Sequence, residues 1–308
     1  MMDSLTPLLA SAVAAAVPLI FAALGELITE RAGVLNLGLE GMMLLGALAA
    51  FATVTHGGGL TLAILAAILA GGLAALIFAI LTLSLQASQV ATGLALAIFG
   101  GGVSAFIGRA YVGFPASERF EPLPIPGLSE IPILGPSLFT MNLLGYLAVV
   151  MLVATSWFLF RTRTGLVLRS VGESPLVARS LGLHVTRIRY VATLFGGAMA
   201  GLAGGYYAVA QFKMWQEGLT SGNGWIALAL VVFASWRPMR IAVGALLFGG
   251  VTAFGMTMQA VGVNISTFLL SSLPYVATIV VLVAISWDAQ ALRRNSPASL
   301  GQPFFDGD

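Results

Sequence analysis

Long apolar runs, separated by short polar stretches, dominate the chain. They lie at about 8–28, 38–54, 60–86, 90–108, 139–160, 190–212, 225–236, 239–261 and 272–287. Several reach the ~20 residues that a helix needs to cross a bilayer. They are solidly apolar, whereas membrane β-barrel strands alternate in polarity and last only about ten residues. The pattern predicts an all-α polytopic transmembrane helical bundle of eight to ten spans, with discontinuous helices.

Composition agrees with the membrane assignment and excludes several kinds of functional site. The chain has 308 residues, of which 58% are hydrophobic and 8% charged, against roughly 25% charged in soluble domains. It has no cysteine, and its histidines, His56 and His184, are far apart. Disulfides, thiolate nucleophiles and cysteine-based metal sites are therefore excluded. We expect no catalytic residues and no metal site, and we interpret the first apolar run as a span rather than a signal peptide, because no basic residue precedes it.

Charge placement predicts the orientation. The stretch 161–189 carries six arginines and one glutamate, out of fourteen basic residues in the chain. By the positive-inside rule this loop is cytoplasmic. Counting outward places 109–138 and 262–271 outside, and the C-terminus, which follows Arg293 and Arg294, in the cytoplasm. Nine full crossings put the N-terminus outside, and a re-entrant 38–54 or 90–108 would reverse that side.

Two loops carry further signals. The segment 114–136 holds six of the thirteen prolines, which block a continuous helix and predict an ordered external loop or lid; a plain connector is the alternative. In the cytoplasmic loop, Ser174 and Pro175 form a helix start and Gly182 a stop, so we predict a short helix over 174–181. It could rest on lipid headgroups or act as a lever for a soluble partner.

Glycines mark two kinds of position. Gly197, Gly201 and Gly205 are four residues apart, which predicts close helix packing within lipid. Elsewhere glycines accompany polar residues inside apolar sequence, and this combination is typical of broken helices that line a cavity. The polar members are Glu26, Glu30, Arg31, Glu40, Gln86, Ser88, Gln89 and the sequence SGNGW at 221–225. We place 30–41 at membrane depth, whereas 86–89 and 213–224 could equally be aqueous loops.

Three strings resemble a known family. They are GELITERAGVLNLGLEGMMLLGA (25–47), RSVGESPLVARSLGLHVTRIRYVATLFGGAMAGLAGG (169–205) and GNGWIALALVVFASWRPMRIAVGALLFGG (222–250). Together they resemble permease subunits of bacterial ABC importers in the branch for branched-chain amino acids, simple sugars and nucleosides, and most closely the nucleoside group linked to basic membrane proteins. The resemblance covers about 15–287. Residues 88–93, SQVATG, depart from the Asn-Glu-like pair that relatives often carry before this glycine, which weakens any transfer of substrate identity.

The resemblance implies a single transmembrane permease domain, 1–308, in the bacterial inner membrane. It implies a second permease chain, identical or homologous, two cytoplasmic ATPase subunits that hold ATP and Mg²⁺, and an extracytoplasmic binding protein. No cofactor is expected in this chain, because it contains no phosphate-binding loop. No nucleic-acid partner is expected either. The 172–182 segment would be the helix that docks on the ATPase, with Gly172, Glu173, Pro175, Ala178 and Gly182 as its signature positions.

For the substrate pathway we predict Asn36, Glu40, Gln89, Asn223 and Trp225. The amide of Asn36 both donates and accepts hydrogen bonds; it could touch substrate, or it could satisfy a broken helix end. A nucleoside is the predicted substrate, and a simple sugar or branched-chain amino acid is the alternative. A less favoured alternative is a secondary transporter in which Glu26, Glu30 or Glu40 relays protons.

Overall fold

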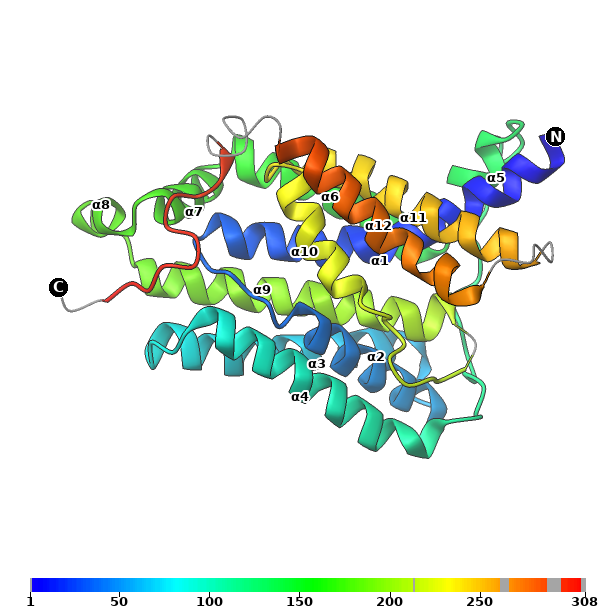
Figure 1. Cartoon of the computed structure of the whole chain (residues 1–308), viewed down its shortest axis with the longest axis horizontal. Helices are drawn as coiled ribbons and strands as arrows, with labels where there is room; N and C mark the ends of the chain where they lie inside the picture. Colours follow the sequence, from blue (N-terminus) through cyan, green and yellow to red (C-terminus); the bar gives the residue numbers. More distant parts are fainter. Residues whose placement is uncertain (1, 213, 261–265, 287–294, 306–308) are drawn as a thin grey trace.

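The computed structural model describes residues 2–212, 214–260, 266–286 and 295–305 as a bundle of helices (Figure 1). The elements are α1 (Met2–Arg31), α2 (Leu39–Thr55), α3 (Gly59–Ala79), η1 (Ile80–Ser84), α4 (Gln89–Gly108), η2 (Arg109–Tyr111), α5 (Leu134–Leu138), α6 (Leu143–Arg161), α7 (Arg163–Glu173), α8 (Pro175–Ser180), α9 (Val185–Tyr206), η3 (Tyr207–Gln211), α10 (Asn223–Phe233), α11 (Pro238–Ala260) and α12 (Thr267–Ser286). Outside these elements, the β-structure of the described residues consists of three isolated bridges. The predicted all-α class is confirmed.

The helices coincide with the apolar runs. Five are long and apolar enough to cross a membrane: Thr6–Arg31, Gly59–Ser84, Gln89–Tyr111, Leu143–Arg161 and Pro238–Gln259. Two others, α2 and α10, are apolar but shorter. Because each predicted run contains one α-helix, with its ends displaced by a few residues, the multi-pass bundle is confirmed. The predicted number of eight to ten spans stays a prediction.

The bundle has two distinct ends (Figure 1). At one end lie α7, α8 and the C-terminal residues 295–305; we call it the α8 end. At the other lie the N-terminus, α5 and the proline-rich loop; we call it the loop end. The arginine-rich and proline-rich segments are thus at opposite ends, as predicted, and the two termini are also opposed, as an odd number of crossings requires. The predictions for 262–265, Arg293 and Arg294 fall outside the described residues.

The helix α9 forms the centre of the bundle and packs against α1, α2 and α3. A Cβ added at Gly197 would lie 2.6 Å from the carbonyl oxygen of Gly71 on α3. A Cβ at Gly201 would lie 3.1 Å from the Gly71 Cα, and one at Gly204 would collide with the Met43 carbonyl on α2. The predicted packing role of these glycines is confirmed, since larger residues would force the backbones apart.

The proline-rich loop is held in place by hydrogen bonds to three parts of the loop end. The Phe120 N–H donates to the Val209 carbonyl at 3.0 Å, and the Leu123 N–H donates to the Met141 carbonyl at 2.9 Å. The Ser117 hydroxyl donates to the Val54 carbonyl at 2.6 Å, near the end of α2. The expectation of an ordered loop is confirmed, and its action as a lid stays a prediction.

Candidate functional site

The chain leaves helical geometry between α1 and α2, and polar side chains bind the freed backbone. The Leu35 N–H donates to Gln89 Oε1 at 2.8 Å. The Asn36 N–H donates to Glu26 Oε1 at 3.2 Å. Irregular backbone inside a membrane protein needs such partners, because no water in the lipid interior can replace them. The glycine-rich stretch at 30–41 is therefore a helix break inside the bundle rather than a surface loop.

Asn36 lies at the centre of this break, and its side chain is 0% exposed. Its Oδ1 accepts a hydrogen bond from the Gly38 N–H at 3.0 Å. Its Nδ2 donates to the Met42 sulfur at 3.4 Å. Both ends of the amide are thus used within its own segment, which is the geometry of a side chain that satisfies a broken helix end.

Glu40, in the first turn of α2, reaches the beginning of α10. Its Oε1 accepts from the Gly222 N–H at 2.9 Å and from the Thr220 hydroxyl, and its Oε2 accepts from the Gly224 N–H at 2.6 Å. A carboxylate is favourable at a helix N-terminus, because free N–H groups and the helix dipole both attract negative charge. One side chain therefore joins the starts of the two short helices, and we call this contact the Glu40 junction.

Beside the Glu40 junction, two predicted residues keep accessible surface. Trp225 is 37% exposed, and Asn223 is half-buried with its Nδ2 donating to the Thr220 carbonyl at 2.6 Å. Glu40 and Gln89 are 9% and 6% exposed. The five predicted pathway residues thus divide into Asn36, Glu40 and Gln89, which hold backbone together, and Asn223 and Trp225, which can still meet a solute.

The segment that follows α10 is hydrogen-bonded to the end of α1, a contact that the sequence analysis did not predict. The Trp236 indole N–H donates to Glu30 Oε2. Arg31 Nη2 donates to the Trp236 carbonyl at 2.9 Å. The sequence signals for this contact were an acidic and a basic residue at the end of α1 and, far along the chain, a tryptophan shortly after α10. Short helix α10 is therefore bonded to the α1–α2 region at both of its ends.

The predicted short helix at the α8 end is confirmed as α8, with Ser174 capping it through a hydrogen bond from the Val177 N–H at 3.5 Å. Its signature positions divide into two groups. Gly172 and Ala178 are buried, and a Cβ at Gly172 would collide with the Arg31 carbonyl. Glu173 is exposed, Pro175 is the first residue of α8, and Gly182 ends the segment with φ +80° in open space. The exposed apolar residues are Leu176, Val177 and Leu181.

Arg189 connects this end to the helix break, although the sequence analysis counted it only among the charges of the cytoplasmic loop. The residue is 1% exposed. Its Nε donates to the Ala32 carbonyl at 3.1 Å, its Nη2 to the Ser299 hydroxyl at 3.1 Å and its Nη1 to the Gln302 carbonyl at 3.3 Å. Ser299 in turn donates to the Gly172 carbonyl at 2.7 Å. The base of α8, the C-terminal residues and the α1–α2 break are thus one hydrogen-bonded unit.

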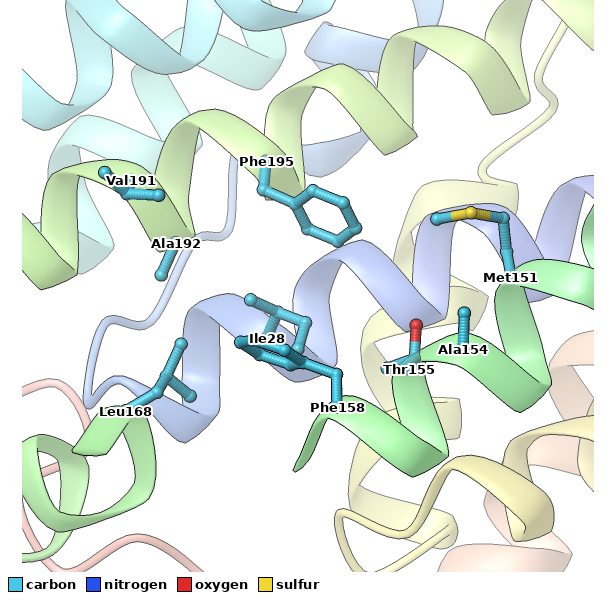
Figure 2. Close-up of a pocket in the computed structure, with 9 residues that line it drawn as sticks. All are labelled: Ile28, Met151, Ala154, Thr155, Phe158, Leu168, Val191, Ala192 and Phe195. Carbon is cyan, nitrogen blue, oxygen red and sulfur yellow. The ribbon is translucent and has the colours of Figure 1, made fainter. Parts of the chain in front are cut away.

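Two cavities differ sharply in chemistry. One of about 270 Å³ lies between α1, α6, α7 and α9, where Figure 2 shows Phe158 and Phe195 projecting into the space; Thr155 is its one polar lining residue. The other, of about 610 Å³, lies at the loop end, and its lining includes Arg119, Asn142, Tyr206 and Gln211. Only the second offers the hydrogen-bonding groups that a polar solute needs.

Known proteins resemble this chain over nearly its whole length. Residues 8–287 match the family described as branched-chain amino acid transport system / permease component. The putative glucose ABC transporter permease protein TsgC13 of Haloferax volcanii is 37% identical over 96% of this chain and 97% of its own. The guanosine ABC transporter permease protein NupQ of Bacillus subtilis is 35% identical, over 95% and 94% respectively. The nucleoside ABC transporter permease protein NupC of Lactococcus lactis is 35% identical, over 86% and 87%.

No solved structure matches the chain. The family match nevertheless runs from residue 8, within α1, to the end of α12, and the relatives are matched over most of their own length. The apolar helices place the protein in a membrane. The chain therefore belongs to the family of permease components of branched-chain amino acid transport systems, and it is a membrane-spanning permease subunit of an ABC transporter, not an enzyme.

Proposed function

We propose that the protein imports nucleosides. The observation that supports a translocation role for this region is the Glu40 junction, where two short helices begin at one buried carboxylate. In other transporters, half-helix N-termini meet near the substrate site, because their free N–H groups and irregular backbone supply polar contacts inside the membrane. Among the predicted residues at the junction, Trp225 offers a face for stacking a base and Asn223 an amide for hydroxyl groups.

The substrate class is inferred from relatives as well as from the site. Two relatives are named as guanosine and nucleoside permeases. A simple sugar is the second candidate, because the relative with 37% identity is named as a putative glucose permease. The exposed indole of Trp225 favours the nucleoside, since a purine or pyrimidine ring gains more from stacking than a sugar does. Asn36, Glu40 and Gln89 then act by holding the pathway backbone.

The partners we propose are a second permease chain, two cytoplasmic ATPase subunits and an extracytoplasmic binding protein. The α8 end faces the cytoplasm, because it carries the arginine-rich loop and cytoplasmic loops of membrane proteins carry an excess of Lys and Arg. The exposed apolar side chains of α8 and its neighbours form the ATPase contact, with Leu176, Val177 and Leu181 outermost. ATP and Mg²⁺ are bound by the partner, and the loop end receives substrate from the binding protein.

Uptake measurements test the substrate. Cells with and without the gene are given labelled guanosine, uridine, glucose, ribose and leucine in separate assays. Nucleoside uptake that depends on the gene, with no change for the other solutes, supports the proposal. Gene-dependent glucose uptake without nucleoside uptake would replace it with the sugar alternative.

A second assay tests the source of energy. Import by an ABC system should follow cellular ATP and persist when a protonophore collapses the proton gradient while ATP is maintained. Immediate loss of uptake under those conditions would instead support a proton relay through the carboxylates Glu26, Glu30 or Glu40.

A further inference from the structure

Four arginines surround a cavity of about 680 Å³ at the α8 end, which we call the arginine cavity. Arg31 comes from the end of α1 and Arg169 from α7, whereas Arg237 directly precedes α11 and Arg240 lies in its first turn. The remaining lining residues are Ser156, Phe160, Pro238, Met239 and Asn295. Among these described lining residues there is no carboxylate, so the cavity carries a local excess of positive charge.

Two of the arginines have hydrogen-bonding capacity to spare. Arg31 donates to the Trp236 carbonyl at 2.9 Å and to the Asn295 carbonyl at 3.2 Å. Its Nε is buried and has no partner within the part of the chain that the structure describes, and the same holds for the Nε of Arg169. A buried donor without an acceptor is unfavourable. An anion in the cavity would lie beside both guanidinium groups and offset their positive charge.

The charges also act on one another. The positive charges of Arg169 and Arg237 repel the charge of Arg31. The negative charges of Glu173 and Glu30 attract it. Arg237 and Arg240 are exposed, so a ligand can reach them. Guanidinium groups bind phosphate oxygens in pairs of parallel hydrogen bonds. A phosphate group therefore fits this cavity better than a neutral solute does.

The apolar part of the lining indicates where the phosphate comes from. Phe160 and Met239 line the same cavity, although they are 43% and 57% exposed. Phe160 lies one residue before the end of α6, and Met239 one residue after the beginning of α11. These are the positions where two apolar spans meet the membrane boundary. A free phosphate ion needs only the arginines, whereas a phospholipid also needs apolar surface beside them.

We propose that the arginine cavity is a binding site for the phosphate headgroup of an anionic membrane lipid, whose acyl chains lie along the outward faces of α6 and α11. Basic pockets between transmembrane helices on the cytoplasmic side have the chemistry for such headgroups. The outward faces are apolar, with Trp157 and Val243 63% and 64% exposed. This inference does not depend on which solute the protein transports.

The test compares lipid preference in variants of the full-length protein. Detergent-purified protein is mixed with phosphatidylglycerol and phosphatidylcholine, and the bound lipids are counted by native mass spectrometry. Arg237→Gln with Arg240→Gln is the test variant, and Arg163→Gln with Arg187→Gln is the matched control, because all four residues are exposed. We expect the test variant to lose about 25-fold of the preference for phosphatidylglycerol, since each arginine near an anionic surface contributes a factor of about five.

The control should keep its preference, and both variants should unfold at the wild-type temperature in phosphatidylcholine alone. Equal preference in the wild type and the test variant would overturn the proposal, as would an equal loss in both variants. Inorganic phosphate is the third arm: stabilisation by phosphate alone, equal to that by phosphatidylglycerol, would identify a phosphate-ion site instead. Loss of ATPase association by a test variant that keeps its lipid preference would identify an acidic protein partner.

Discussion

The Glu40 carboxylate accepts a hydrogen bond of 2.6 Å from the backbone N–H of Gly224, although the two residues are 184 positions apart in the chain. A Cβ at Gly224 would lie 2.6 Å from the Glu40 Cα, so the two backbones nearly touch. Because α2 begins at Leu39 and α10 at Asn223, this contact makes two short helices start from one point. Any movement of α10 during transport must either carry Glu40 with it or break these bonds.

Replacement of Glu40 by glutamine tests that contact. The amide keeps one acceptor oxygen but presents an NH₂ group to N–H donors, so at least one of the bonds to Gly222 and Gly224 is lost. Because the lost bond is made to a charged group, we expect a stability loss of about 1.5–3 kcal/mol, measured as a lower unfolding temperature of the purified protein. Uptake should fall with it.

The matched control is Glu217→Gln, which removes an exposed carboxylate from the same connecting segment. It should leave both unfolding and uptake unchanged. If Glu40→Gln instead unfolds like the wild type but makes uptake insensitive to the proton gradient, Glu40 is a proton carrier and the structural account is wrong.

The sequence predicts much of this fold because each membrane helix can be recognised from its own run of apolar residues. A run of ~20 apolar residues is sufficient to place a span, and the runs coincide with the helices, α10 included. The break at 30–41 was also predictable, because glycines and polar residues interrupt an apolar run there. The hydrogen-bond partners of this break were not predictable. That Glu40 meets Gly222 and Arg189 meets Ala32 depends on packing between segments more than 150 residues apart, which no local pattern encodes.

The segment around α8 gives a paired prediction about folding and coupling. Gly172→Ala should lower the amount of protein in the membrane, because its Cβ would collide with the Arg31 carbonyl. Glu173→Lys should leave that amount unchanged, since Glu173 is exposed, yet it should abolish substrate-stimulated ATPase activity of the assembled complex. Membrane abundance and ATP hydrolysis are measured for both variants.

A variant at Gly182 adds a third test of the segment around α8. The glycine has φ +80°, and no atom lies near an added Cβ. Gly182→Leu therefore strains the backbone by roughly 1–2 kcal/mol without a clash, and we expect an inserted but uncoupled permease. Normal substrate-stimulated ATPase activity in both Glu173→Lys and Gly182→Leu would refute the assignment of this segment to coupling.

Arg189 should be intolerant even of lysine. Its guanidinium donates to Ala32, Ser299 and Gln302 at once, and an ammonium group cannot reproduce that planar arrangement. Arg189→Lys should destabilise the protein by about 1–3 kcal/mol because buried acceptors lose their donors. Arg187→Lys, two residues away and exposed, is the control that should behave like the wild type. Thermal unfolding distinguishes the two, and equal unfolding temperatures would show that the C-terminal contacts are dispensable.

Asn36 allows the two interpretations of the helix break to be separated. Asn36→Leu removes the acceptor for the Gly38 N–H and leaves that donor buried, which costs about 1–3 kcal/mol. Because both ends of the amide are already used, we expect lower membrane abundance with near-normal uptake per molecule. Asn36→Asp keeps an acceptor for Gly38 but adds a second carboxylate near Glu26, so it should reduce abundance further.

Asn223→Leu is the comparison, because Asn223 is half-buried at the same junction. Here the expected result is the reverse: near-normal abundance and uptake reduced several-fold, since one hydrogen bond to an uncharged partner is worth ~0.5–1.5 kcal/mol. Immunoblots of membranes, measured beside uptake of labelled nucleoside, give both quantities for each variant. If Asn36→Leu keeps full abundance and loses uptake, then Asn36 contacts the solute despite its burial, and the bonds to Gly38 and Met42 must open during the transport cycle.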